Sequence, residues 1–154
     1  MTLCVYCTRT GITKQIAEQI AKTVGGDTLF ISNGKNYDGT WGFVRAAVVG
    51  LKRSFPALAP FTPEHPLSSY DRVIVCAPIW SENVCPIARS FLKRYGDELT
   101  GKVYYVVTHM SDIGYDKKIV WLDAVLGRLS DGYLSVQTKD HDYAADVAAF
   151  CETL

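Results

Sequence analysis

The chain has 154 residues, and we expect residues 1–154 to form one domain that buries a sizeable hydrophobic core. Its 16 basic and 16 acidic residues cancel, so no basic surface for nucleic acid is indicated. No apolar run approaches the ~20 residues that span a bilayer, and the first residues lack a signal-peptide pattern, so we expect a cytoplasmic protein without a transmembrane segment.

The first part of the chain reads as a strand, a turn and a helix. Residues 2–7 are mostly apolar and predict a buried strand, and residues 13–24 place apolar side chains at helical spacing before Gly25. The turn between them, residues 8–12, carries threonines and Gly11. Backbone N–H groups and hydroxyls converge at such a helix start, which suits an anion, most often a phosphate. The alternative is an ordinary turn whose threonines cap the helix.

Two other phosphate-binding patterns do not fit this turn. No lysine follows Gly11, so the turn is not the G-x-x-x-x-G-K-[ST] loop of nucleoside triphosphate-binding proteins. A low-molecular-weight tyrosine phosphatase needs a cysteine, five residues and then an arginine, but Thr13 stands at that distance from Cys7.

A long connection follows the second predicted strand, residues 28–31. Residues 33–40 read as a loop, residues 41–53 as a helix, and residues 54–68, with four prolines, as an extended irregular segment. The apolar face of the predicted helix consists of Trp41, Val44, Val48 and Leu51. We expect Trp41 to pack rather than to act as a lid. A connection of this length, 33–68 in all, either carries function or covers the sheet.

The remaining sequence alternates strands and helices. The apolar run 73–77 should be a central strand, because it has no polar member and must be covered on both faces. Further strands are predicted at 102–108 and 133–138, and helices at 86–95, 116–129 and 141–153. Such alternation predicts an α/β fold with a five-stranded parallel sheet, in the order 2-1-3-4-5, between helical layers. Ligands bind such sheets outside the carboxyl ends of the first and third strands, which the loops 8–13 and 78–83 follow.

Five cysteines, at positions 4, 7, 76, 85 and 151, are interpreted as buried free thiols in a reducing compartment. Cys4 and Cys7 have C-x-x-C spacing, but they lie in a strand. Residues three apart in a strand face opposite sides of the sheet. A thioredoxin-like dithiol is therefore not expected.

The threonine turn and the third-strand region together resemble those of flavodoxins. The motif Thr8-x-Thr10-Gly11-x-Thr13, directly after a strand and opening a helix, looks like the FMN-phosphate loop of that family. The segment Tyr70-Asp71-x-Val73-Ile74-Val75, running into Ala77-Pro78-Ile79-Trp80, is similar to its third strand and following loop. This resemblance covers most of the chain. It implies a flavodoxin-like three-layer sandwich that binds FMN and transfers one or two electrons.

The resemblance also implies which residues contact the cofactor. The threonine turn would hold the phosphate, Trp80 would stack on the flavin ring, and the loop after the fourth strand would cover the other side of the ring. The implied set is Thr8, Arg9, Thr10, Gly11, Ile12, Thr13, Pro78, Ile79, Trp80, Ser81, Glu82, Asn83, Thr108, His109, Gly114 and Tyr115. No catalytic residue or metal ligand is assigned. The alternatives are a core or surface position for Trp80, a helix start at Tyr115, a solvated His109 and an exposed Glu82.

Three features depart from the flavodoxin pattern. The chain is neutral where small electron-carrier flavodoxins are acidic, so steering toward a basic partner is weak. The loop after Trp80 lacks the glycine of flavodoxins, which leaves Asn83 as the residue suited to a left-handed backbone. The insertion 33–68 lies where it could reach the flavin edge, which suits an enzyme with a substrate pocket.

The predicted function is therefore that of an FMN-binding electron-transfer flavoprotein, either a carrier or a small FMN-dependent oxidoreductase. Quinone reductases and a protoporphyrinogen oxidase are among the enzymes of this fold. The alternative is a flavodoxin-fold binding or regulatory module without redox activity. The expected partner is a redox protein or a small-molecule electron donor or acceptor, and the expected state is a monomer or weak dimer.

Overall fold

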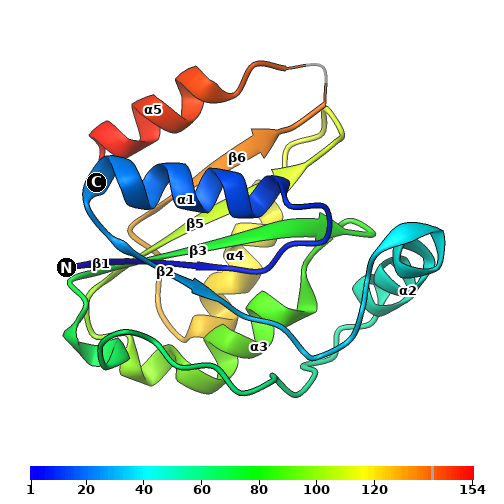
Figure 1. Cartoon of the computed structure of the whole chain (residues 1–154), viewed down its shortest axis with the longest axis horizontal. Coiled ribbons are helices and arrows are strands. Elements are labelled where there is room, and N and C mark those ends of the chain that lie inside the picture. The colour runs from blue at the N-terminus through cyan, green and yellow to red at the C-terminus, as the bar shows by residue number, and fades with distance from the viewer. Residues whose placement is uncertain (140) are drawn as a thin grey trace.

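A computed structural model describes residues 1–139 and 141–154 and contains a central parallel sheet (Figure 1). Its strands are β1 (Thr2–Tyr6), β2 (Asp27–Phe30), β3 (Arg72–Trp80), β5 (Lys102–His109) and β6 (Gly132–Gln137). They pair in the order β2-β1-β3-β5-β6, which confirms the predicted topology. A short strand, β4 (Asn83–Val84), pairs antiparallel with the end of β3 and was not predicted.

Two helical layers cover the sheet (Figure 1). One holds α1 (Ile12–Val24) and α5 (Ala144–Glu152), and the other holds α3 (Pro86–Tyr95) and α4 (Asp116–Leu126). The helix α2 (Gly39–Leu51) lies beyond the carboxyl ends of the strands. The predicted end of α4 at residue 129 was wrong, because Gly127 adopts a left-handed backbone and its N–H caps the helix on the carbonyl of Asp123.

The strands alternate their side chains between two cores. Leu3, Val5 and Cys7 face the α3 and α4 side, whereas Cys4 and Tyr6 face the α1 and α5 side. This confirms that the two C-x-x-C cysteines point to opposite faces of the sheet. All five cysteines are free, and burial raises the pKa of the Cys4 thiol to about 12, so it stays protonated and unreactive at neutral pH.

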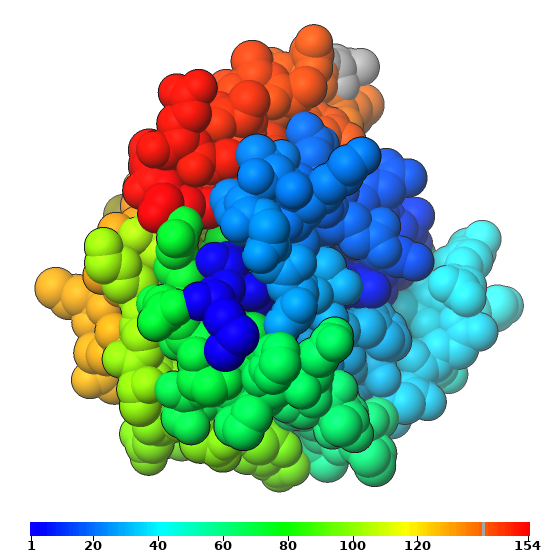
Figure 2. All heavy atoms as spheres, turned by 60° about the vertical axis from the view of Figure 1, so that its left-hand side comes forward, coloured from blue at the N-terminus to red at the C-terminus, as the bar shows by residue number. Residues whose placement is uncertain are grey.

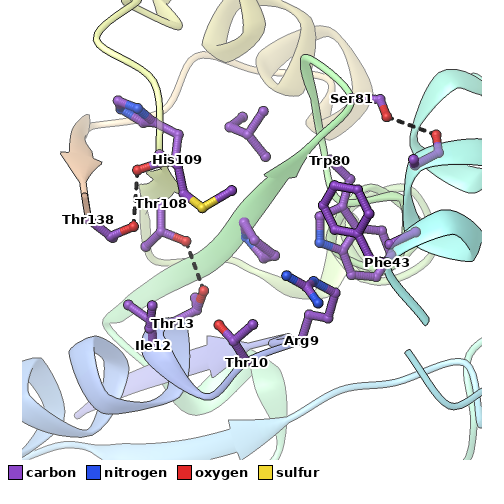
Figure 3. A pocket seen from close by; sticks show the side chains of 15 residues that line it. Arg9, Thr10, Ile12, Thr13, Phe43, Trp80, Ser81, Thr108, His109 and Thr138 are labelled. Carbon is purple, nitrogen blue, oxygen red and sulfur yellow. Dashed lines mark hydrogen bonds between the residues drawn. The ribbon is translucent and has the colours of Figure 1, made fainter. Parts of the chain in front are cut away.

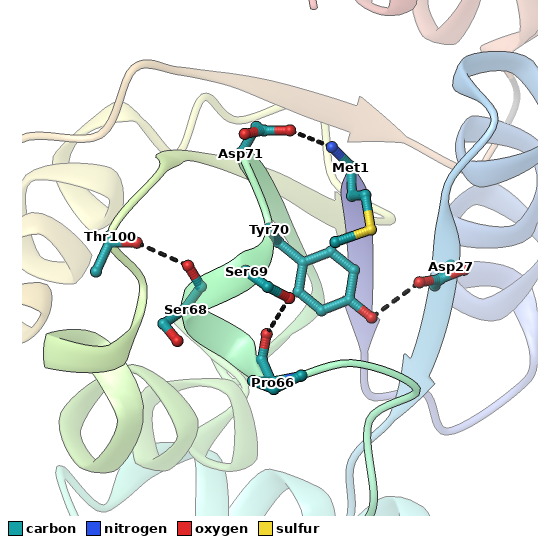
Figure 4. A network of polar contacts seen from close by, with 8 residues as sticks. All are labelled: Met1, Asp27, Pro66, Ser68, Ser69, Tyr70, Asp71 and Thr100. Atoms are coloured by element: carbon teal, nitrogen blue, oxygen red, sulfur yellow. Dashed lines mark hydrogen bonds and ion pairs between the residues drawn. The ribbon is translucent and has the colours of Figure 1, made fainter.

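Polar contacts fix the amino ends of the strands (Figure 4). The amino group of Met1 pairs with Asp71, just before β3. The Tyr70 hydroxyl donates to Asp27 Oδ2 at 2.8 Å, which links the start of β3 to the start of β2. Figure 2 shows the amino terminus packed beside α1 and the segment before β3, with α5 next to α1. The carboxyl ends of β1 and β3 lie at the opposite edge of the sheet.

The packing of α2 overturns the expectation for Trp41. The buried residues of α2 are Gly42, Ala46 and Gly50, whereas Trp41 is 85% exposed. A methyl group at Gly42 would lie 2.0 Å from the carbonyl carbon of Tyr37, and one at Gly50 would lie 2.4 Å from the carbonyl oxygen of Trp80. The small residues therefore let the backbone of α2 approach the neighbouring chain closely, and the bulky apolar side chains of the helix face outward.

Candidate functional site

The threonine turn opens α1 with unpaired backbone donors. Gly11 has a left-handed backbone (φ 91°), and its N–H donates to Thr8 Oγ1 at 3.0 Å. The N–H of Gln15 reaches the carbonyl of Gly11 at 3.0 Å, so α1 offers no acceptor to the amides of residues 12–14. No side chain among the described residues caps α1, so the alternative in which the threonines cap the helix was wrong. These amides face the space in front of the helix.

A cavity of about 370 Å³ begins at this turn and runs between β3, β5 and α2 (Figure 3). Its lining residues are Arg9, Thr10, Ile12, Thr13, Phe43, Ala46, Ala47, Pro78, Ile79, Trp80, Ser81, Thr108, His109, Met110 and Thr138. Among the described residues on this wall, Arg9 is the only arginine, and no lysine or carboxylate is present. The hydroxyls of Thr13 and Thr108 share a buried hydrogen bond of 2.8 Å, which ties the start of α1 to β5. The cavity thus joins a cationic, donor-rich end to a mainly apolar body.

The predicted loop 78–83 is a hairpin. β3 continues to Trp80 and turns back through two left-handed residues, Ser81 (φ 47°) and Glu82 (φ 66°), into Asn83 of β4. Asn83, the residue suited to a left-handed backbone, lies in β4 instead. A two-residue turn with both φ angles positive matches the right-handed twist of the strands, which favours this geometry even without glycine. Glu82 is exposed, as its alternative anticipated.

Side chains of this hairpin hold α2 against the cavity. Ser81 Oγ donates to the carbonyl of Ala47 at 2.9 Å, and Asn83 Nδ2 donates to the carbonyl of Gly50 at 3.1 Å. The second carbonyl lies in the last turn of α2, where the helix supplies no partner of its own. The Ser81 hydroxyl is drawn with its bond in Figure 3. The position of α2 is therefore coupled to the loop after β3.

Two aromatic side chains form one end of the cavity. Trp80 is 6% exposed and packs its ring 4.7 Å from that of Tyr37, so it belongs to the core as well as to the cavity wall. Phe43 comes from α2, and the guanidinium carbon of Arg9 lies over its ring, 5.3 Å from the ring centroid. Figure 3 shows Arg9 between Thr10 of the threonine turn and the rings of Phe43 and Trp80. The cation–π contact closes the edge between the threonine turn and α2.

His109 lies in a hydrogen-bonded network rather than in solvent. Its Nδ1 donates to the carbonyl of Ser111 at 2.7 Å, and its Nε2 lies 2.8 Å from the hydroxyl of Ser135. The ring also packs 4.8 Å from that of Tyr115. The alternative of a solvated His109 was wrong. Because a carbonyl can only accept, the proton of the neutral ring sits on Nδ1 and Nε2 accepts from Ser135.

The structure brings most of the predicted contact residues together. Those that line the cavity are Arg9, Thr10, Ile12, Thr13, Pro78, Ile79, Trp80, Ser81, Thr108 and His109. Those outside its wall are Thr8, Gly11, Glu82, Asn83, Gly114 and Tyr115. Thr8 and Gly11 instead shape the turn, and Tyr115 packs on His109 at the start of α4.

The residues that sequence reasoning missed come mainly from α2. Phe43, Ala46 and Ala47 line the cavity, together with Met110 and Thr138. In α2 the small residues Gly42, Ala46 and Gly50 recur every four residues and form its packing face. This spacing was the sequence signal from which the inward side of the helix could have been predicted.

No known protein-family profile matches the sequence, and no curated protein matches it. Solved structures do match. A candidate flavoprotein from Bacteroides uniformis ATCC 8492 superposes with a TM-score of 0.77 and 21% identity, covering 98% of this chain and 97% of that one. The chain has a flavodoxin-like fold. A Lactobacillus acidophilus NCFM flavoprotein solved with FMN gives a TM-score of 0.68 and 20% identity over 87% of this chain and 91% of that one.

The Megasphaera elsdenii flavodoxin in its two-electron reduced form gives a TM-score of 0.60 and 17% identity, over 99% of this chain and 96% of that one. At these identities the likeness establishes the fold, and function has to be argued from the site. No helix in the described part of the chain is both long and apolar enough to cross a membrane.

Proposed function

We propose that the chain binds FMN non-covalently in this cavity and acts in electron transfer. The observation that carries the proposal is that a phosphate-suited helix start and an aromatic wall both border one cavity of about 370 Å³. Cavities of this size accommodate small-molecule ligands. The residues fit FMN, a molecule with a phosphate at one end and a flat ring at the other.

The phosphate end is built from donors of this chain. The amides of residues 12–14 and the hydroxyl of Thr10 would donate to the phosphate oxygens, and the α1 dipole favours an anion there by about 0.3–1 kcal/mol. Arg9 adds a positive charge that no carboxylate on the described cavity wall cancels. This end therefore favours FMN over a flavin that lacks the phosphate.

The ring end is built from apolar side chains. Trp80, Phe43 and Ile79 would exclude water from the flavin, and Pro78 lies beside them on the wall. Bound FMN supplies one- and two-electron redox chemistry. The chain's contribution is to position the ring, exclude water and set the polarity around it. His109, held by its hydrogen bonds to Ser111 and Ser135, lines the β5 side of the cavity.

The spectrum and flavin affinity of the purified protein test this proposal. We expect a yellow protein, or a colourless one that takes up FMN, and riboflavin should bind at least about tenfold more weakly because it lacks the phosphate. A protein that takes up no FMN would instead favour the alternative of a non-redox binding module. Equal affinity for FMN and riboflavin would contradict the assignment of the threonine turn.

Trp80 can be tested directly. Trp80→Ala should weaken FMN binding and change the quenching of flavin fluorescence, while Trp80→Phe, which keeps an aromatic ring in the core, should retain most of the affinity. Because Trp80 is buried, the alanine variant should also lose about 3–5 kcal/mol of stability. If both variants bind and quench as the wild type does, Trp80 does not stack on the flavin.

We further propose that the chain works as one domain in the cytoplasm, with a redox protein or a small molecule as its partner. Between a carrier and a small oxidoreductase, α2 favours the enzyme, because Phe43, Ala46 and Ala47 build a wall that a bare electron carrier does not need. Anaerobic titration with a nicotinamide or a quinol discriminates between them. Direct two-electron reduction supports an enzyme, whereas reduction only through a partner protein supports a carrier.

A further inference from the structure

The outward side of α2 presents an exposed apolar stripe. Trp41, Val44, Val48 and Leu51 recur at intervals of three and four residues and so share one face of the helix, which we call the α2 apolar face. Trp41 is 85% exposed and Leu51 is 69% exposed. In both Figure 1 and Figure 2, α2 projects from the rest of the molecule. Large side chains gathered on one exposed face indicate a surface that another body covers.

This orientation is imposed by the fold. On the opposite side of the helix, Gly42 is already in close backbone contact with Tyr37 and Gly50 with Trp80, and Ala46 between them is buried. The helix cannot turn its bulky side inward, because bulky side chains do not fit in the space that the small residues leave. The α2 apolar face therefore stays outward whether or not the cavity holds a ligand.

The charge around this face identifies what covers it. Arg45, Lys52 and Arg53 lie in or directly after α2, against one acidic residue at its start, Asp38, and the exposed Glu82 of the neighbouring hairpin, so the helix itself carries a net positive charge. A second copy of the chain, related by a two-fold axis, would bring these like charges together. A surface that is anionic and apolar at once matches both properties of the helix.

We propose that α2 docks on the surface of a membrane that contains anionic lipids. A projecting helix with bulky apolar side chains can enter the headgroup region, with tryptophan at the interface and basic side chains on the headgroups. Phe43 of the same helix lines the cavity, so the docked element is also part of the cavity wall. The proposal goes beyond electron transfer and does not depend on bound flavin.

Vesicle flotation of the full chain tests the proposal, with and without added FMN. We expect binding to vesicles of equimolar phosphatidylcholine and phosphatidylglycerol, and at least about tenfold weaker binding to phosphatidylcholine alone, because each basic side chain near an anionic surface adds to the attraction. Binding should fall as salt is raised. Failure to bind either vesicle, or equal binding to both, would overturn the proposal, whatever the result with FMN.

Matched variants locate the surface. Trp41→Glu combined with Leu51→Glu should abolish vesicle binding, whereas Leu129→Glu should not, because Leu129 is 81% exposed but lies beyond α4. Lys52→Gln combined with Arg53→Gln should reduce the preference for anionic vesicles. The far-ultraviolet circular dichroism of each variant should match the wild type. A wild-type dimer in solution that Trp41→Glu dissociates, without vesicle binding, would assign the face to a second copy and refute lipid docking.

Discussion

At the scale of single residues, the site depends on backbone conformations that side chains alone do not reveal. Gly11 turns the chain from β1 into α1 with a left-handed backbone, and its N–H is paired with Thr8. This leaves the amides of residues 12–14 pointing away from the helix. The turn therefore binds through the main chain as much as through its hydroxyls, and its geometry matters more than any one threonine.

Gly11 and Gly25 offer a matched pair for testing this. Both have left-handed backbones (φ 91° and 68°), and, chain neighbours aside, no atom of the described residues lies within 4 Å of the position where a Cβ would be added. Gly11→Ala and Gly25→Ala should each lose about 1–2 kcal/mol of unfolding free energy, measured by urea denaturation. Only Gly11→Ala should weaken FMN binding. Equal effects of both variants on FMN affinity would show that the turn geometry is not part of the site.

Tyr70 should make stability depend on alkaline pH. Burial, followed by its hydrogen bond to Asp27, raises the pKa of Tyr70 from 10.0 to about 12. Between these values the unfolded chain releases the proton and the folded chain retains it. The Tyr70 contribution to stability is therefore fully present below pH 10 and lost as the pH rises through about 12. Tyr70→Phe should flatten the fall in unfolding free energy over this range, and an unchanged slope would rule out this linkage.

At the scale of elements, α2 joins the long connection to the cavity. It is held by the hydrogen bonds from Ser81 and Asn83, and its end is held by Arg89, whose Nη2 donates to the carbonyl of Lys52 at 3.0 Å. Arg89 is fully buried, and its guanidinium lies 4.6 Å from the ring centre of Trp121. Burial lowers the pKa of Arg89 to about 10, which still leaves it charged at neutral pH. These contacts hold α2, and with it Phe43, in place at the cavity wall.

Substitution at Gly50 should separate α2 from the hairpin. Alanine would improve helix propensity by about 1 kcal/mol, but its methyl would lie 2.4 Å from the carbonyl oxygen of Trp80. The overlap is with backbone atoms and cannot be relieved by a rotamer change. Gly50→Ala should therefore lower the free energy of unfolding by about 1–2 kcal/mol net. FMN affinity, measured by fluorescence titration, should fall with it.

The control for this experiment is Thr40→Ala, an exposed change in the first turn of the same helix. It should leave both stability and flavin affinity close to the wild type. If Gly50→Ala also leaves flavin affinity unchanged, then α2 does not form part of the cofactor pocket.

At the scale of the whole molecule, the sheet brings the threonine turn, the hairpin and the end of β5 to one edge, while the polar network at Tyr70 and Met1 fixes the other. Ligand binding at the carboxyl ends of the strands should therefore stabilise the whole fold. FMN at a hundred times its dissociation constant should add about 2.7 kcal/mol and raise Tm by roughly 5–10 °C.

Differential scanning calorimetry measures this shift. Adenosine monophosphate, which carries a phosphate but no flavin, should raise Tm much less, and riboflavin should fall between the two. A shift with FMN no larger than that with adenosine monophosphate would indicate a phosphate site without a flavin pocket.

The order of strands and helices, the parallel sheet and the two loops at the carboxyl ends of its strands could all be predicted from the sequence. These follow from alternating hydrophobic periods, because a central strand such as β3 must be apolar throughout and a βα turn must satisfy its own helix start. The resemblance to flavodoxins, and not these local rules, implied Trp80 and Thr108 as site residues, and both line the cavity.

The inward side of α2 could not be predicted in this way, because it depends on packing against the rest of the chain, which places Phe43 on the cavity wall and leaves Trp41 exposed. Helical spacing shows that residues share a face, but it does not show whether the bulky face or the small one packs. Close backbone approach at Gly50 outweighed the burial of large side chains. The hairpin at Ser81 and the network around His109 were decided in the same way, by contacts between segments far apart in the chain.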